Sequence, residues 1–333
     1  MLEKPSIADA DIVVCLCEAY GLEVAGVTFL PLGADGNTAV FSVTTADQTN
    51  YFLKLRSGAF VETAVSLPKH LHDQGNPHII SPLPTQTGGL WAELGDYRMI
   101  LYPFVAGRNG YEVALTEEQW RQFGAAVRQL HTTIVPPELQ AQILRYHTTN
   151  RWREAVRGLL AMGEPFVDDL ARETAVFLQA KRDELLNLIN RAEQLSVVVD
   201  SLTDLVVCHA DLHAGNLLLD DSGKLFVVDW DTLLLAPKER DLLFVGGGLL
   251  GNWCSAAEEV ALFYAGYGET AVNRAALAYF RYDRLLEDIA LYGEELLLTN
   301  ADSADRAQAL YYLQANFRPN GTIALAQQAE GGE

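Results

Sequence analysis

Two polar segments at the ends of a short apolar hairpin constrain the fold of this chain more than any other feature of its sequence. The first segment is residues 208–216 (CHADLHAGN) and the second is residues 228–231 (VDWD), with a turn at residues 220–223 between them. Since a hairpin brings its two ends together, we expect Asp211, Asn216 and Asp229 to converge. Two carboxylates and an amide are hard oxygen ligands, so the sequence predicts a site suited to Mg²⁺.

The hydrophobic period of the chain changes near residue 103. Before this point the pattern predicts strands at 24–32, 40–45, 51–55, 90–94 and 97–102, with helices at 9–20 and 60–73. After it, the pattern predicts helices at 116–133, 152–162, 167–195, 255–267, 272–298 and 301–316. An all-β island at 206–228 interrupts these helices, and the tail 327–333 is expected to fray. The sequence therefore predicts an α+β fold, with a small β-rich lobe (1–103) before a larger, mainly helical lobe (104–333).

The charge of the chain is strongly negative. Its 24 Lys and Arg residues against 44 Asp and Glu residues give a formal net charge of −20. Nucleic acid and anionic membrane surfaces need Lys and Arg on their partner, so the composition argues against both as partners. An acidic surface instead suits a small cationic ligand, with solubility alone as the alternative explanation.

The sequence predicts neither a membrane span nor a secretion signal. No stretch approaches the ~18 apolar residues of a transmembrane helix, and no basic region precedes an apolar core at the N-terminus. The cysteines Cys15, Cys17, Cys208 and Cys254 form no CxxC pair, so we expect neither a structural zinc site nor a disulfide framework. These features indicate a cytoplasmic protein, and no obligate protein partner is evident.

The spacing within the island carries a resemblance. The island contains the pattern His-x-Asp, with an Asn five residues after the Asp. A further Asp follows 13 residues later, behind an apolar strand. This spacing resembles the catalytic loop and metal motif of protein-kinase-like phosphotransferases. The resemblance implies a bilobal protein-kinase-like fold. It also implies that Asp211 is the catalytic base, while Asn216 and Asp229 hold Mg²⁺. The alternative is a chance turn rich in Asp and His.

A kinase-like site also needs a lysine on the third strand, which binds the nucleotide phosphates, and a helical glutamate that orients it. Lys54 lies in the strand predicted at 51–55, on the same face as Phe52, and Glu62 follows eight residues later in the next predicted helix. The alternatives are a solvated edge lysine and an exposed helical glutamate. The resemblance implies that Lys54 and Glu62 form this pair.

The resemblance assigns two more segments to the nucleotide. The turn with Gly33 and Gly36 would lie over the phosphates, which its backbone N–H groups can cradle, although it departs from the protein-kinase pattern GxGxxG. Tyr102 and Phe104 belong to the expected hinge (102–105), whose backbone groups would meet the adenine.

Several departures exclude an ordinary protein kinase. Residues 209–211 (HAD) lack the arginine that couples to a phosphorylated activation loop, residues 229–231 (DWD) replace DFG, and no APE follows. These features resemble the aminoglycoside phosphotransferase family. Residues 208–216, 228–231, 236–248 and 282–290 are most similar to the spectinomycin phosphotransferases within it. This resemblance implies transfer of the γ-phosphoryl group of ATP, with Mg²⁺, to a hydroxyl of a cationic aminocyclitol, most of all spectinomycin.

Other functions remain open at this point. The same architecture serves kinases of choline, homoserine, methylthioribose and fructosamine, so the acceptor can be a small metabolite. A non-catalytic nucleotide-binding regulator is a further alternative, against which the complete set of Lys54, Asp211, Asn216 and Asp229 argues.

Four more residues are candidates for the acceptor site. Asp231, Glu287 and Asp288 can hold ammonium groups of the acceptor, with solvated helix charges as the alternative for the last two. Trp253 can line the acceptor pocket, with a core aromatic as the alternative.

Overall fold

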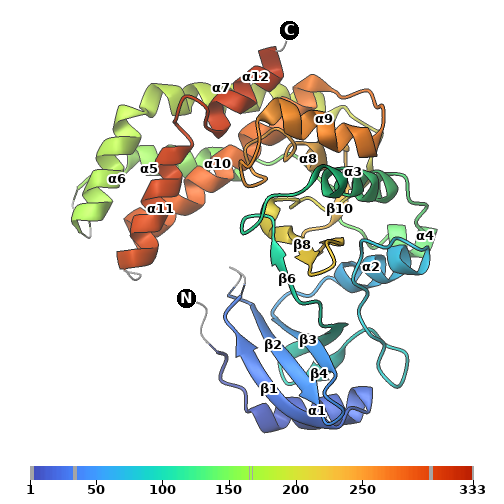
Figure 1. Cartoon of the computed structure of the whole chain (residues 1–333). Coiled ribbons are helices and arrows are strands. Elements are labelled where there is room, and N and C mark those ends of the chain that lie inside the picture. Colours follow the sequence, from blue (N-terminus) through green and yellow to red (C-terminus); the bar gives the residue numbers. More distant parts are fainter. Residues whose placement is uncertain (1–3, 33–35, 165, 167, 300–302, 332–333) are drawn as a thin grey trace. The chain divides into compact units, whose positions relative to one another are not determined.

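The computed structural model describes residues 4–32, 36–164, 166, 168–299 and 303–331 (Figure 1). The chain forms two compact units, each built from separate segments. The first unit comprises Met1–Val113, Thr133–Ile143 and Gly215–Leu233, and the second comprises Ala114–Thr132, Leu144–Ala214 and Leu234–Glu333. The chain therefore enters each unit several times, and the single lobe boundary after residue 103 stays a prediction.

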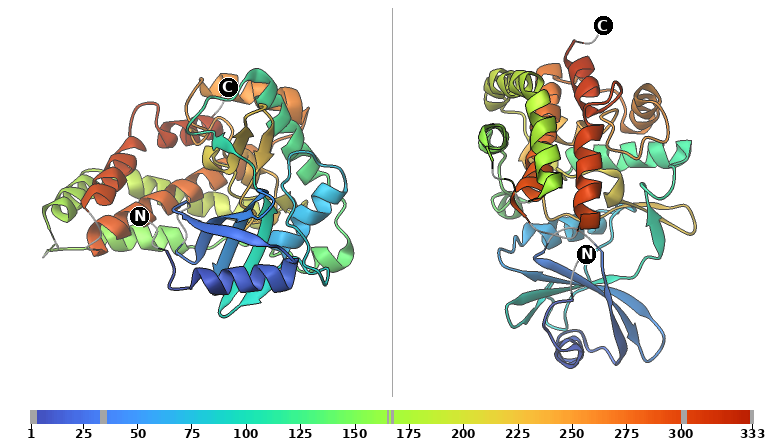
Figure 2. Two further views of the ribbon diagram at one scale, coloured as in Figure 1. Left: turned by 60° about the horizontal axis from the view of Figure 1, so that its bottom comes forward. Right: turned by 90° about the vertical axis from the view of Figure 1, so that its left-hand side faces the viewer.

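An antiparallel five-stranded sheet forms the frame of the first unit. Its strand order is β1 (Val24–Leu30), β2 (Thr38–Thr45), β3 (Asn50–Ser57), β5 (Tyr97–Pro103) and β4 (Ala92–Leu94). Helix α1 (Asp9–Tyr20) covers one face of this sheet (Figure 2). Its Ile12 and Leu16 pack with Leu53 and Leu55 of β3 in the buried core. Because side chains alternate along a strand, Phe52 and Lys54 point to the opposite face of the sheet.

The rest of the first unit contains a β-hairpin and a second helix. Strands β8 (Leu217–Asp220) and β9 (Leu225–Val227) form the predicted hairpin, and β6 (Gly107–Asn109) pairs with β8. Val227 N donates to the carbonyl of His78 at 2.9 Å, which ties the hairpin to the segment after α2 (Thr63–Asp73). The short helix α4 (Pro137–Gln140) completes this unit.

The second unit is mainly helical. Helix α3 (Glu117–His131) begins with a capping box formed by Thr116 and Gln119. A two-stranded sheet pairs β7 (Val206–Cys208) with β10 (Leu234–Ala236). The other helices are α5 (Arg151–Ala161), α6 (Asp169–Ala180), α7 (Arg182–Asp200), α8 (Glu239–Leu242), α9 (Ala256–Tyr267), α10 (Arg274–Leu298), α11 (Ser303–Ala315) and α12 (Thr322–Gly331). Helix α10 lies at the centre and packs against α5, α6, α7, α8, α11 and α12 (Figure 1).

Two sequence expectations about the helices are wrong. The helix predicted over 167–195 is two helices, α6 and α7, because Lys181 between them leaves the helical conformation. The tail does not fray before Gly331, because α12 extends to this residue. Glu330 in α12 forms an ion pair with Arg191, and its carboxylate accepts a hydrogen bond from the Tyr282 hydroxyl at 2.8 Å. Partners so distant in sequence leave no local signal.

No helix within the described ranges combines the length and the apolar character that crossing a membrane requires.

Candidate active site

Lys54 joins two carboxylates in the first unit. Its Nζ donates to Oδ1 of Asp229 at 3.1 Å and to Oδ2 of Asp231 at 2.8 Å. The Lys54 side chain is only 11% exposed. Burial lowers the pKa of Lys54, but the charges of Asp229 and Asp231 outweigh this effect and hold the pKa above its usual value. The structure thus brings together a lysine of the sheet and the carboxylates that follow the hairpin.

The hairpin β8–β9 also brings Asn216 close to the segment of Asp229. Val228 N donates to the carbonyl oxygen of Asn216 at 3.0 Å, so Asn216 lies beside the residue that precedes Asp229. Asp229 has a left-handed backbone conformation (φ 63°). Residues other than glycine adopt this conformation mostly where the surrounding structure enforces it. Asn216 is buried, whereas the Asp229 side chain is 53% exposed. These two segments offer an amide and an accessible carboxylate, and this donor set fits Mg²⁺.

Glu62 does not contact Lys54. It is exposed and precedes α2 instead of lying within it, because α2 begins only at Thr63. Phe60, which the pattern assigned to this helix, packs edge-to-face on Trp91 with ring centroids 5.1 Å apart. Among the ion pairs of the described residues, the carboxylate partners of Lys54 are Asp229 and Asp231. The predicted pair of Lys54 with Glu62 is therefore not formed in this structure.

The predicted nucleotide residues of the sheet share the face that carries Lys54. Phe52 of β3 pairs with Tyr102 of β5, and their rings meet edge-to-face at 6.4 Å. Burial, followed by the charges of Asp231 and Asp229, raises the pKa of Tyr102.

Two flanking positions complete this face. Phe104, just after β5, is 38% exposed. Gly36 lies in the turn before β2 with open space where a side chain would stand, and Gly33 lies outside the described residues.

Asp211 lies in the loop after β7, in the second unit. Its Oδ1 accepts a hydrogen bond from Nη1 of Arg284 on α10 at 2.9 Å. Its Oδ2 lies 3.4 Å from Nε2 of His213. Burial raises the pKa of Asp211, but His213 and Arg284 outweigh it and hold the pKa well below its usual range. Asp211 is therefore ionised at physiological pH.

Asp241 holds the backbone of this loop. Its carboxylate accepts hydrogen bonds from the N–H groups of His209 (2.9 Å) and Ala210 (2.7 Å). Ala210 has a left-handed backbone (φ 68°), so these bonds secure a conformation that alanine rarely adopts. His131 on α3 lies 3.0 Å from the same carboxylate through Nε2, and its Nδ1 lies 2.8 Å from the Tyr267 hydroxyl. Sequence reasoning missed Asp241, His131 and Tyr267.

The four candidate acceptor residues have different surroundings. Asp231 pairs with Lys54, and Asp288 accepts a hydrogen bond from Nε of Arg284 at 3.1 Å. Within the described part of the chain, the Glu287 carboxylate has no hydrogen bond or ion pair. Trp253 is 49% exposed.

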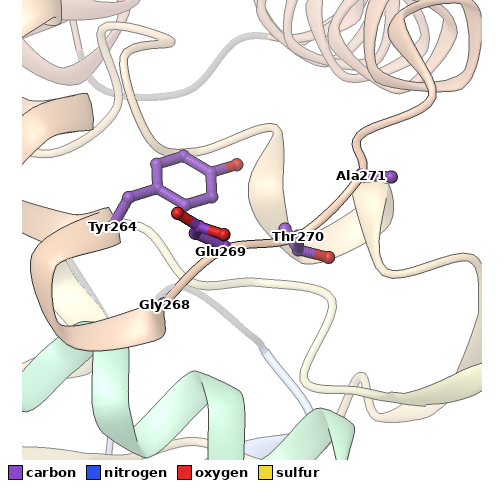
Figure 3. Close-up of a pocket in the computed structure, with 5 residues that line it drawn as sticks. All are labelled: Tyr264, Gly268, Glu269, Thr270 and Ala271. Atoms are coloured by element: carbon purple, nitrogen blue, oxygen red, sulfur yellow. The ribbon is translucent and has the colours of Figure 1, made fainter.

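One pocket of the described part of the chain contains none of these groups. It has a volume of about 680 Å³ and lies at the end of α9, where Tyr264, Gly268, Glu269, Thr270 and Ala271 line it (Figure 3). Since none of its lining residues belongs to the predicted set, cavity volume alone does not locate the site.

A sheet lysine paired with carboxylates behind a hairpin, and a His-x-Asp loop in a helical unit, are features of kinase-like phosphotransferases. The chain matches the model of the phosphotransferase enzyme family (APH) over residues 28–282 and belongs to this family. The protein is therefore an enzyme of the small-molecule kinase class, as the sequence predicted, and the prediction of a kinase-like α+β fold is also confirmed.

Two solved structures resemble almost the whole chain. Spectinomycin phosphotransferase APH(9)-Ia in complex with ADP and spectinomycin is 34% identical, with a TM-score of 0.89 over 98% of this chain and 99% of that one. The AMP-bound complex of the same enzyme is 32% identical, with a TM-score of 0.84 over 96% of this chain and 98% of that one. Both hold adenine nucleotides, and kinase-like phosphotransferases use ATP with a divalent metal ion, in agreement with the predicted cofactors.

More distant relatives extend the likeness. Protein StrN of Streptomyces griseus is 24% identical over 235 residues, which are 66% of this chain and 69% of that protein. A microcompartment-associated aminopropanol kinase shares the fold at 16% identity, with a TM-score of 0.64 over 96% of this chain and 97% of that one.

Proposed function

We propose that this protein transfers the γ-phosphoryl group of Mg·ATP to a hydroxyl of a cationic aminocyclitol antibiotic, spectinomycin above all. The likeness to spectinomycin phosphotransferase, 34% identity over 98% of the chain, carries this proposal. The net charge of −20 supports it, because the acceptor would be a cation.

The first unit would bind the nucleotide. Lys54 would contact the α- and β-phosphates, while Asn216 and Asp229 would hold Mg²⁺ with their side-chain oxygens. Bound there, Mg²⁺ neutralises negative charge on the phosphates. Tyr102 and Phe104 would flank the adenine.

The glycine turn and Glu62 have smaller parts in this proposal. The backbone of Gly36, with that of Gly33, would cover the phosphates. Glu62 would orient Lys54 by a further ion pair, since Asp229 and Asp231 take only two of the three N–H donors of an ammonium group.

The reaction joins the acceptor oxygen to the γ-phosphorus while the bond from this phosphorus to the β,γ-bridging oxygen breaks, and ADP leaves. The proton of the hydroxyl passes to a carboxylate oxygen of Asp211 and then to solvent. Because the pKa of Asp211 is well below its usual range, this carboxylate is a weak base. The main contribution of Asp211 would be to orient the hydroxyl. In a loose transition state the hydroxyl proton is transferred late, so a strong base is not required.

The acceptor would meet the carboxylates and the aromatic residue of the candidate set. Glu287 has no protein cation bound to it and would pair with an ammonium group of the acceptor, and the exposed Trp253 would contact its apolar surface. Asp231 and Asp288 are already paired with Lys54 and Arg284, so we expect them to contribute less to acceptor binding than Glu287 does.

Phosphorylation of a panel of acceptors tests this proposal. The purified protein is incubated with ATP and Mg²⁺ and with spectinomycin, choline, homoserine, methylthioribose or a fructosamine, and mass spectrometry detects a product heavier by one phosphoryl group. We expect spectinomycin to be phosphorylated, and the matched variant Asp211→Asn to give far less product. Phosphorylation of a metabolite but not of spectinomycin would overturn the proposed acceptor. The absence of any product, with ATP still bound, would favour a regulator.

A further inference from the structure

Arg284 connects the catalytic loop to the central helix of the second unit. It lies on α10, and its guanidinium donates from Nη1 to Oδ1 of Asp211 at 2.9 Å and from Nε to Oδ1 of Asp288 at 3.1 Å. Its side chain is 23% exposed, and those of Asp211 and Asp288 are 24% and 18% exposed. One cation thus bridges two carboxylates that water reaches poorly.

The chemistry of arginine suits a permanent contact. A guanidinium stays protonated at every physiological pH, and its planar fork fixes the direction of each hydrogen bond. Burial lowers the pKa of Arg284, but the charges of Asp288 and Asp211 outweigh this and raise it above its usual value. Charge-assisted hydrogen bonds of this kind are stronger than neutral ones.

The contact leaves room for a substrate on Asp211. A carboxylate offers about four lone-pair positions, and Arg284 uses one of them. Arg284 at Oδ1 and His213 at Oδ2 together restrict the rotation of the Asp211 carboxylate, and the hydrogen bond from Arg284 takes up only one of its lone-pair positions.

We propose that Arg284 is a positioning residue for phosphoryl transfer: anchored by Asp288, it holds the Asp211 carboxylate in the orientation that receives the acceptor hydroxyl. The role of Asp211 in this inference rests on the proposed function. Asp288 acts through Arg284, whereas Glu287, its neighbour in sequence, is the residue proposed above to pair with the acceptor. No local pattern in the sequence marks Arg284, because Asp211 lies 73 residues before it.

Steady-state kinetics of Arg284 variants test this role. We expect Arg284→Gln to lower kcat about 10- to 100-fold, because misorientation of a reacting group costs about this much, while the KM for the acceptor and the affinity for Mg·ATP stay within about 2-fold. Arg284→Lys keeps the charge but not the fork, so its kcat should lie between those of Arg284→Gln and the wild type. For Arg284→Ala, added guanidinium ion should restore part of kcat.

The carboxylate neighbours of Arg284 separate positioning from acceptor binding. Asp288→Asn should lower kcat at an unchanged acceptor KM, and its effect should not add to that of Arg284→Gln in the double variant, because both remove one arrangement. Glu287→Gln should instead raise the acceptor KM. An increase in acceptor KM as the main effect of Asp288→Asn would overturn its assigned role as the anchor of Arg284.

Arg157 provides a matched control. Its guanidinium also bridges two carboxylates, Glu154 at 2.7 Å and Glu193 at 2.8 Å, but these pairs lie on the surface of α5 and α7. Arg157→Gln should leave kcat unchanged. Wild-type kcat in Arg284→Gln, or a loss in Arg284→Ala that guanidinium does not restore, would overturn the inference about Arg284.

Failure of this inference is distinguishable from failure of the proposed function. Product formed from spectinomycin by the wild-type protein tests the proposed function alone. The ratio of variant to wild-type kcat tests Arg284 with any acceptor that is phosphorylated, and with water as the acceptor in ATP hydrolysis where no other acceptor reacts. A protein that phosphorylates a different acceptor and needs Arg284 for it would refute the first proposal and support the second.

Discussion

Each unit of this protein contains a cationic side chain that bridges two aspartates, but the two arrangements differ in the type of cation and in the exposure of the carboxylates. In the first unit, Lys54 bridges Asp229 and Asp231, and in the second, Arg284 bridges Asp211 and Asp288. The lysine presents a compact charge on a flexible stem, and its partner Asp229 is 53% exposed. The arginine presents a rigid fork, and both of its partners are less than 25% exposed.

The exposure of the carboxylates determines which ion pair can change partners. An ammonium that faces a half-exposed carboxylate can leave it when Mg²⁺ and phosphates arrive, because water and the new ligands compensate both charges. Separating Arg284 from two largely buried carboxylates would remove both ion pairs of the guanidinium, at a cost of several kcal/mol. We therefore interpret the Lys54 arrangement as exchangeable and the Arg284 arrangement as permanent.

The largest effect should come from Asp211, at the reacting end of the permanent arrangement. Asp211→Asn should lower kcat by ~10²–10⁴-fold, because the neutral amide orients the hydroxyl less well than the carboxylate and cannot take up its proton. Calorimetry should show Mg·ATP affinity close to that of the wild type, because the residues that we propose to bind the nucleotide belong to the first unit. Near-normal turnover by this variant would refute the assignment of Asp211.

Asp229 should produce the next largest effect, and on a different quantity. Asp229→Ala should lower the affinity for Mg·ATP by about 10- to 100-fold, because the variant loses a proposed metal ligand. Mutation of residues that only support a metal ligand already lowers metal affinity by about this factor. Isothermal calorimetry with and without Mg²⁺ measures the loss. Asp231→Asn is the matched control, since it also removes a carboxylate from Lys54 but no proposed metal ligand. If the two variants bind Mg·ATP equally well, the two carboxylates do not differ in the way that we propose.

The exchangeable arrangement could be predicted largely from the sequence. The hairpin brings the segments of Asn216 and Asp229 together by local geometry, whereas Lys54 was implied by the resemblance to kinase-like phosphotransferases. Glu62 is the N-cap of α2, one residue before the helix begins, and the hydrophobic period alone does not define a helix boundary to within one or two residues.

The supports of the catalytic loop could not be predicted in this way. Asp241 and His131 lie 110 residues apart, and Arg284 reaches Asp211 across 73 residues. Neither contact leaves a periodic pattern, because each joins a loop or helix end to an element that only the tertiary fold brings near it. The same holds for β10, whose three residues become a strand only by pairing with β7.

His131 should affect stability more than chemistry. His131→Ala should lower the free energy of unfolding by about 1–3 kcal/mol, because it leaves the fully buried Asp241 carboxylate with one partner fewer. Urea denaturation measures this change. Tyr267→Phe, which removes the hydroxyl on the other side of the imidazole, should cost about 1 kcal/mol and serves as the graded control. An unchanged midpoint in His131→Ala would show that the loop does not depend on this contact.

The smallest effect concerns how the permanent arrangement responds to pH. Burial raises the pKa of Asp288 to about 6, with the charge of Glu287 adding to the rise and that of Arg284 opposing it. The folded state therefore favours protonated Asp288, and its contribution to stability is full below pH ~4 and is lost as the pH rises through about 6. Asp211 behaves oppositely, because its lowered pKa means that its contribution is lost as the pH falls below ~4.

The free energy of unfolding, measured by urea titration from pH 3 to pH 8, should separate these two carboxylates. Burial also raises the pKa of Asp283 to about 6 and that of Glu259 to about 7, so the wild-type slope contains their contributions. The difference between the wild type and Asp288→Asn isolates Asp288, and it should change by about 1–3 kcal/mol between pH 4 and pH 6. The difference between the wild type and Asp211→Asn should stay flat over that interval and change only below it. Equal pH dependence of the two differences would mean that Asp288 and Asp211 have similar pKa values in the folded protein. This result would contradict different roles for the two carboxylates, with Asp288 anchoring the guanidinium of Arg284 and Asp211 held by it.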